Sequence, residues 1–113
     1  MTDGQVVGLL GLAMRAGQVL PGAGRALELI RQGQAGLVLM DEASSDNTRK
    51  RFGDACAHHQ TECLMLPSGV LGEAIGRYGT MVAAMRPGGI TEKLRGASAR
   101  NDRSSTEQSI CGG

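Results

Sequence analysis

Short, continuous apolar runs alternate along this chain with longer segments that carry apolar residues at helical spacing. Three runs, residues 37–40, 63–66 and 81–85, contain only aliphatic residues, Met, Ala and Cys. Such runs are typical of strands that are covered on both faces. The segments between them repeat their apolar positions at intervals of three and four. The alternation predicts an α/β fold, a three-layer α/β/α sandwich with a small mixed sheet, about five helices and three to four strands.

Local signals indicate where the expected elements begin and end. Thr2 with Gln5 forms a capping box before the first helix, and Ser44 or Ser45 caps the third. A very short strand at residues 19–20 is cut off by a proline. The other expected signals are helix stops near Gly17 and Gly33, a Ser68 cap for a fourth helix, and a short last helix carrying Ile90 and Leu94.

The periodic pattern stops at residue 96. Beyond it Ser, Arg, Asn, Asp, Thr and Gly dominate, and only Ile110 is strongly apolar. Such a composition cannot bury enough apolar surface to fold alone. We therefore expect one domain at residues 1–95 and a disordered tail at residues 96–113, as the length of the chain allows.

Composition and charge restrict the classes of partner. The chain has one Tyr, one Phe and no Trp, which argues against a surface that stacks single-stranded bases on aromatic rings. Its formal net charge is only +1, so any contact with RNA must depend on the local distribution of charge. Three cysteines, no signal-like N-terminus and no apolar stretch near the roughly 20 residues of a bilayer span predict a cytoplasmic protein away from the membrane.

A glycine-rich turn at residues 21–25 precedes the second expected helix. Gly22, Ala23 and Gly24 would leave the backbone open, and Arg25 adds a cation. A helix N-terminus offers up to four unbonded N–H groups and roughly half a positive charge, which suits phosphate or a base edge. Two other interpretations remain open at this point: a tight turn that needs positive φ, and a site for a small anion or nucleotide.

The order and spacing of several segments resemble the kink-turn RNA-binding ribosomal-protein superfamily (the L-seven-Ae type), and within it the bacterial YlxQ-like branch. The resemblance covers nearly all of residues 3–95. It rests on the segments Leu9–Ala13, Ile30–Gly33 followed by Leu37–Leu39, Asp41–Lys50, and Leu71–Gly76. It implies a compact α/β/α sandwich that binds structured RNA without catalysis.

The resemblance also implies which residues contact RNA. It places the helix that enters kinked RNA at the glycine turn, and adds the loop at Ser44 and the loop that begins Gly76-Arg77-Tyr78. Arg77 would contact phosphate, and Tyr78 would stack on a flipped base. Kink-turn binders carry Asn, Glu and Lys at the start of this helix, where the present chain has a different set: Gly24, Arg25 and Glu28. We include these residues in the expected RNA site, although base-specific readout must then take another form.

Two further clusters of charged or reactive residues are expected to have structural roles. The run at residues 49–51 is more typical of a solvated helix face than of a phosphate-binding stripe, and Arg51 is expected to pair with Asp54. The chain has residues of the types that bind zinc, but their spacing does not form a compact Cys-x-x-Cys motif. We therefore expect no metal, and we expect the thiols to have a buried structural role. The candidate ligands are Cys56, His58, His59 and Cys63.

No catalytic residue and no cofactor are expected. Asp41, Glu42, Ser44 and Ser45 cluster near the end of a strand, but no histidine lies at a spacing that would activate a nucleophile. We predict a non-catalytic protein that binds structured RNA, ribosomal or kink-turn-like, with ribosome or translation-factor contacts. The alternatives are a protein-interaction adaptor that kept the fold and lost RNA binding, and a phosphorylated-metabolite sensor.

Overall fold

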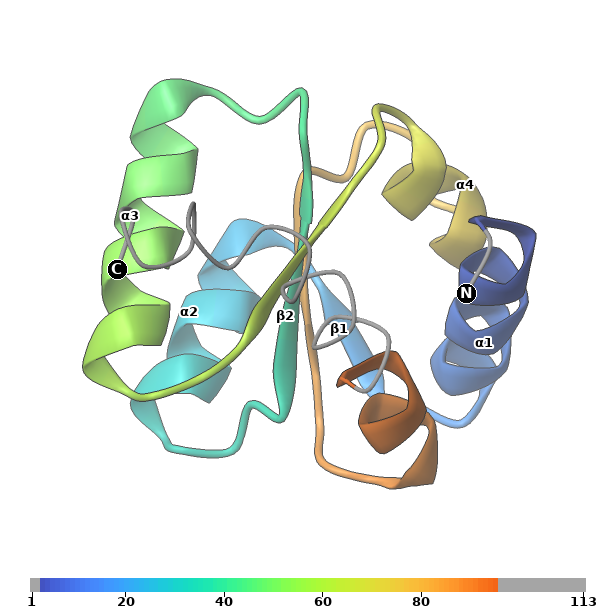
Figure 1. Cartoon of the computed structure of the whole chain (residues 1–113), viewed down its shortest axis with the longest axis horizontal. Coiled ribbons are helices and arrows are strands. Elements are labelled where there is room, and N and C mark those ends of the chain that lie inside the picture. The colour runs from blue at the N-terminus through green and yellow to red at the C-terminus, as the bar shows by residue number, and fades with distance from the viewer. Residues whose placement is uncertain (1–2, 96–113) are drawn as a thin grey trace.

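The computed structural model describes residues 3–95, which form four labelled helices, four strands and a further helical segment at residues 89–95 (Figure 1). The expected cap at Thr2 and the expected tail at 96–113 lie outside the described residues. In chain order the labelled elements are α1 (Asp3–Arg15), β1 (Val19–Pro21), α2 (Ala23–Arg31), β2 (Leu37–Asp41), α3 (Asp46–His58), β3 (Cys63–Leu66), α4 (Val70–Ile75) and β4 (Val82–Met85).

The four strands form one mixed sheet in the order β1-β4-β2-β3. β2 pairs with β3 in parallel, whereas β4 is antiparallel to both β1 and β2. The carboxyl ends of β1, β2 and β3 therefore meet the amino end of β4 at one edge of the sheet. We call this the loop edge; it comprises residues 21–25, 41–46, 67–70 and 76–82. Pro21 is tolerated because β1 is an edge strand.

Helices cover both faces of the sheet, which confirms the three-layer prediction. In Figure 1, α1, α4 and the helical segment 89–95 lie on one side of the strands, and α2 and α3 lie on the other. Successive residues of β2 and β4 pack alternately into the two apolar layers. Both central strands are buried along their whole length, because each is covered on both faces.

Most local signals act as expected. Gly17 and Gly33 adopt φ of 74° and 72° just beyond α1 and α2, where the left-handed conformation ends a helix. Ser45, rather than Ser44, caps α3, since its hydroxyl oxygen accepts a hydrogen bond from the Thr48 N–H at 3.1 Å. No helix in residues 3–95 has the length and apolar character needed to cross a bilayer.

The expected Ser68 cap of α4 is wrong. The residue before this helix is Gly69, which has φ of 84° and makes no side-chain cap. The Gly69 N–H instead donates a hydrogen bond to Asp41 Oδ2 at 2.8 Å. A left-handed turn therefore separates Ser68 from the first helical N–H groups, and a carboxylate from β2 holds that turn.

Candidate nucleic-acid interface

The turn before α2 requires glycine at one position. Gly22 has φ of 107° and ψ of 141°, a region open essentially to glycine alone, and its N–H donates to the Val82 carbonyl at 2.9 Å. Gly22 is also the N-cap of α2, so the helix has no side-chain cap, and its first turn carries no acidic residue. The positive end of α2 is thus left unneutralised by its own first turn.

Gly24 differs from Gly22 because the fold does not demand it. It lies inside the first turn of α2, outside the positive-φ region, and a Cβ atom placed there would meet nothing within 4 Å. Glycine in a helix costs roughly 1 kcal/mol relative to alanine. Neither backbone conformation nor internal packing offsets that cost, while the missing side chain leaves the helix backbone open to close approach from outside.

The residues that lead into β4 connect two loops of the loop edge. The Met81 carbonyl accepts hydrogen bonds from the Asp41 N–H at 2.8 Å and from the Ser44 hydroxyl at 3.4 Å. The carbonyl of the next residue, Val82, accepts a hydrogen bond from the Gly22 N–H. Ser44 is 3% exposed, and its single hydroxyl hydrogen is shared between the Met81 carbonyl and the nearer Asp41 carbonyl, at 2.6 Å. Its side chain therefore joins loops and does not face solvent.

The carboxylate of Asp41 organises the same edge from inside. It is fully buried, with Oδ1 accepting from the Ala43 N–H at 2.7 Å and Oδ2 from the Gly69 N–H at 2.8 Å. It thereby ties the loop after β2 to the loop after β3. The position of Asp41 at the end of a buried apolar run was the sequence signal for this internal role.

The loop between α4 and β4 presents its side chains outward. Gly76 ends α4 with φ of 73°, and the Arg77 N–H donates to the Gly72 carbonyl at 2.9 Å. A Cβ on Gly72 would lie 3.0 Å from the Arg77 carbonyl oxygen, so this loop packs closely on α4. Arg77 is exposed, and Tyr78 is 85% exposed. This closely packed loop thus presents a cation and an aromatic ring to solvent.

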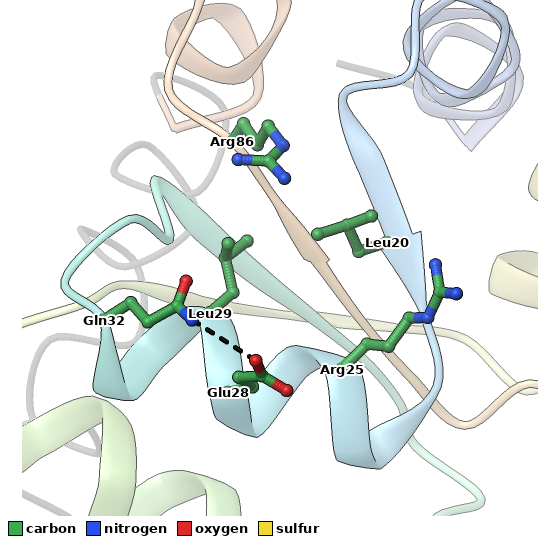
Figure 2. Close-up of a pocket in the computed structure, with 6 residues that line it drawn as sticks. All are labelled: Leu20, Arg25, Glu28, Leu29, Gln32 and Arg86. Carbon is green, nitrogen blue, oxygen red and sulfur yellow. Dashed lines mark hydrogen bonds between the residues drawn. The ribbon is translucent and has the colours of Figure 1, made fainter.

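Arg25 and Glu28 border an open pocket of about 240 Å³ between β1 and α2, which we call the α2 groove (Figure 2). Glu28 Oε1 accepts a hydrogen bond from Gln32 Nε2 at 3.3 Å. Sequence reasoning missed most of this groove, although Gln32 lies four residues after Glu28 and so on the same helix face. The lining residues are Leu20, Arg25, Glu28, Leu29, Gln32 and Arg86.

The basic run on α3 is largely paired within its own helix. Arg49 forms an ion pair with Asp46 at 2.6 Å, and Lys50 forms one with Asp54 at 3.5 Å. The expected pairing of Arg51 with Asp54 is therefore wrong. Lys50 and Asp54 are four residues apart, with the two side chains stacked on one face of the helix, which favours this pair.

The four residues of zinc-ligand type divide between the core and the surface. Cys56 and Cys63 pack in the layer beneath α2 and α3, and a hydrogen bond with Cys56, together with burial, raises the pKa of the Cys63 thiol. His58 and His59 are exposed near the end of α3, with ring centroids 4.9 Å apart. Within residues 3–95, no three His, Cys, Asp or Glu side chains are grouped so as to hold a metal ion.

Comparison with known proteins places this architecture in a family. A sequence model of the Ribosomal protein L7Ae/L30e/S12e/Gadd45 family matches residues 5–93. The RNA-binding protein YlxQ of Bacillus subtilis (strain 168) is 38% identical over 87 residues, covering 76% of this chain and 87% of that protein. The RNA-binding protein YlxQ of Enterococcus faecium is 32% identical over 62 residues, covering 55% and 60%.

Two solved structures share this fold. A protein with unknown function from Bacillus halodurans C superposes with a TM-score of 0.75 at 31% identity, covering 80% of this chain and 92% of that one. The Giardia lamblia 15.5kD RNA binding protein superposes with a TM-score of 0.68 at 20% identity, covering 81% and 82%; this likeness shows the fold alone. Both curated relatives are named as RNA-binding proteins, and membership of this family supports the expectation of a non-catalytic chain. The chain belongs to the ribosomal protein L7Ae/L30e/S12e/Gadd45 family, in its YlxQ-like branch.

Proposed function

We propose that this chain binds structured RNA, ribosomal or kink-turn-like, through its loop edge, in a cytoplasmic role associated with translation or the ribosome. The observation that carries the proposal is the start of α2. Its positive end has no side-chain cap and no acidic residue, and an exposed arginine follows Gly24 directly. The names of the curated relatives support the same class of ligand.

Each part of the loop edge has a distinct role in this proposal. The first-turn N–H groups of α2 hold a phosphate, and Gly24 lets the RNA backbone approach the helix closely. Arg25 and Arg77 supply charge-assisted contacts to phosphates. Tyr78 stacks on an unpaired base. Ser44 acts indirectly, because its hydroxyl is used to hold the loops together.

Gly24 and Arg25 stand where kink-turn binders carry Asn and Glu. Gly24 has no side chain with which to read a base, and Arg25 contacts phosphate, so recognition at these two positions relies on backbone and phosphate contacts. Contacts of this type recognise the shape of RNA more than its sequence. We therefore expect binding to kinked or internal-loop RNA with a marked dependence on salt. At the third position Glu28 is negative where those proteins have a cation, so its side chain can only accept hydrogen bonds.

The test compares two double charge reversals that change the net charge equally. Arg25→Glu with Arg77→Glu alters the loop edge, whereas Arg51→Glu with Lys93→Glu alters exposed cations on other elements. Binding to a ribosomal kink-turn fragment is measured from low to physiological salt. The loop-edge variant should lose about tenfold or more in affinity and show a shallower salt slope, whereas the control should keep both within about threefold.

The outcomes separate the alternatives. Equal losses in the two variants would mean that only overall charge matters, and the loop edge would not be the interface. If the unaltered protein bound neither kink-turn, internal-loop nor duplex RNA at low salt, RNA binding would be rejected and the adaptor interpretation preferred.

A further inference from the structure

We propose that the α2 groove takes one unpaired guanine nucleotide of the bound RNA, with Glu28 contacting the base and Arg25 and Arg86 contacting its flanking phosphates. This inference rests on the proposed function and extends the RNA surface from the loop edge along α2 toward the opposite edge of the sheet. Figure 2 shows Arg25 and Arg86 on either side of Leu20, with Glu28 and Gln32 on the wall formed by α2.

The size and floor of the groove suit a single base. Its volume of about 240 Å³ lies below the 300–1,000 Å³ typical of pockets for drug-sized ligands and has room for one base. Leu20 on β1 and Leu29 on α2 provide an apolar floor. Arg25, Glu28, Gln32 and Arg86 at its rim are exposed, so the sugar and phosphates of a bound nucleotide can stay outside.

Glu28 gives the groove its preference for guanine. An ionised carboxylate only accepts hydrogen bonds, and each of its two oxygens can accept more than one. Gln32 Nε2 donates to one of these oxygens at 3.3 Å and helps to orient the group. Guanine is the one standard base with two adjacent N–H donors, at N1 and N2, on its Watson–Crick edge. Adenine, cytosine and uracil each place an acceptor where the carboxylate needs a second donor.

The two arginines supply the charge for phosphate. Arg25 comes from the first turn of α2, and Arg86 follows the last residue of β4. Arg86 Nη1 donates to Gln34 Oε1 at 3.4 Å, which leaves its other guanidinium N–H groups for a ligand. With Glu28 counted, the groove carries a net charge of about +1, which favours a phosphorylated ligand over a neutral nucleoside.

The test uses the full chain and four RNAs that share one kinked stem and differ only in a single unpaired nucleotide, G, A, C or U. The protein should bind the G form about tenfold more tightly than the other three. Glu28→Gln should reduce that preference below about threefold, because a neutral amide cannot accept from both donors. Glu73→Gln, which neutralises an exposed carboxylate on α4, should preserve it. Arg86→Glu should weaken all four RNAs alike.

Two results would overturn the inference without touching the proposed function. One is equal binding of the four RNAs while the Arg25→Glu and Arg77→Glu double variant still weakens binding by about tenfold or more; the other is an unchanged preference in Glu28→Gln. A parallel titration with guanosine monophosphate, followed by amide NMR shifts of Leu20, Glu28 and Leu29, identifies the source of the nucleotide. Shifts with the free nucleotide in a protein that binds no RNA would show a metabolite site and reject the RNA subsite.

Discussion

Helices α2 and α3 cover the same face of the sheet and both begin at the loop edge, yet their first turns differ in chemistry (Figure 1). α3 starts at a serine whose oxygen accepts the Thr48 N–H, and Asp46 follows in its first turn. α2 starts at Gly22, with neither a side-chain cap nor an acidic residue in its first turn. The protein thus caps the start of α3 with its own side chains and leaves the start of α2 without such a cap.

Their basic residues differ in the same way. On α3, Arg49 and Lys50 each lie beside a carboxylate of the same helix. On α2, Arg25 borders an open groove in which Glu28 is hydrogen bonded to Gln32. The two helices therefore differ in where their carboxylates lie: on α3 they pair with the basic residues, and on α2 the carboxylate is hydrogen bonded to an amide.

The substitution with the largest expected effect tests whether α3 stabilises the fold without taking part in RNA binding. Phe52, 1% exposed, anchors α3 to the sheet, so Phe52→Ala should lower the free energy of unfolding by about 3–5 kcal/mol. Chemical denaturation measures this change. RNA affinity, measured under conditions in which the variant is still folded, should stay within about threefold of that of the unaltered protein. A selective loss of RNA binding in a still-folded variant would contradict the division of roles between α2 and α3.

An intermediate effect tests the cap of α3. Ser45→Ala removes the oxygen that accepts from the Thr48 N–H and should cost about 1 kcal/mol of stability. Ser45→Asp keeps an acceptor at the same position and serves as the matched variant, with a loss of only a few tenths of a kcal/mol expected. If both variants were equally destabilised, the hydrogen bond to Thr48 would not be the source of the effect.

The smallest expected stability effect gives the sharpest comparison. Gly24 in α2 and Gly53 in α3 both lie within helices, and a Cβ on either would meet nothing within 4 Å. Gly24→Ala and Gly53→Ala should therefore each stabilise the fold by about 0.5–1 kcal/mol. Only Gly24→Ala should weaken RNA binding, by about tenfold if a phosphate or base approaches that backbone closely. Thermal unfolding and RNA titration of the two variants measure both quantities.

A contrary result in this pair is equally informative. Unchanged RNA affinity in Gly24→Ala would mean that the backbone there is not approached closely, and the interface would have to depend on side chains such as Arg25 alone. Lower stability in Gly53→Ala would mean that the open space around both glycines does not predict their energetics.

Local features of the fold could be predicted because the interactions behind them are local. A strand covered on both faces needs a continuous apolar run, and β2 and β4 carry one. A helix that ends in the left-handed conformation favours glycine, as at Gly17 and Gly33. The Ser68 cap failed for a local reason as well, since the glycine that follows it takes a left-handed turn of its own.

The expected site could be predicted only in part. The turn at residues 22–25 was identified from its glycines and arginine, and the loop at residues 76–78 from the family resemblance; the structure places both at the loop edge. The burial of Ser44 could not be anticipated, because it depends on a carbonyl of Met81, 37 residues away in the chain. Arg86 was missed for the same reason: its neighbours in the α2 groove come from β1 and α2.

By itself, the sequence determined the three-layer class, the positions of most strands and helix stops, and an uncapped glycine turn before the second helix. Those features follow from the periodic spacing of apolar side chains and from local backbone conformation, which both depend on only a few neighbouring residues. Only the tertiary structure decided that the chain entering β4 lies between Gly22 and Asp41, and that a groove runs along α2. The strand order β1-β4-β2-β3 brings distant segments together, so their contacts depend on packing over the whole sheet.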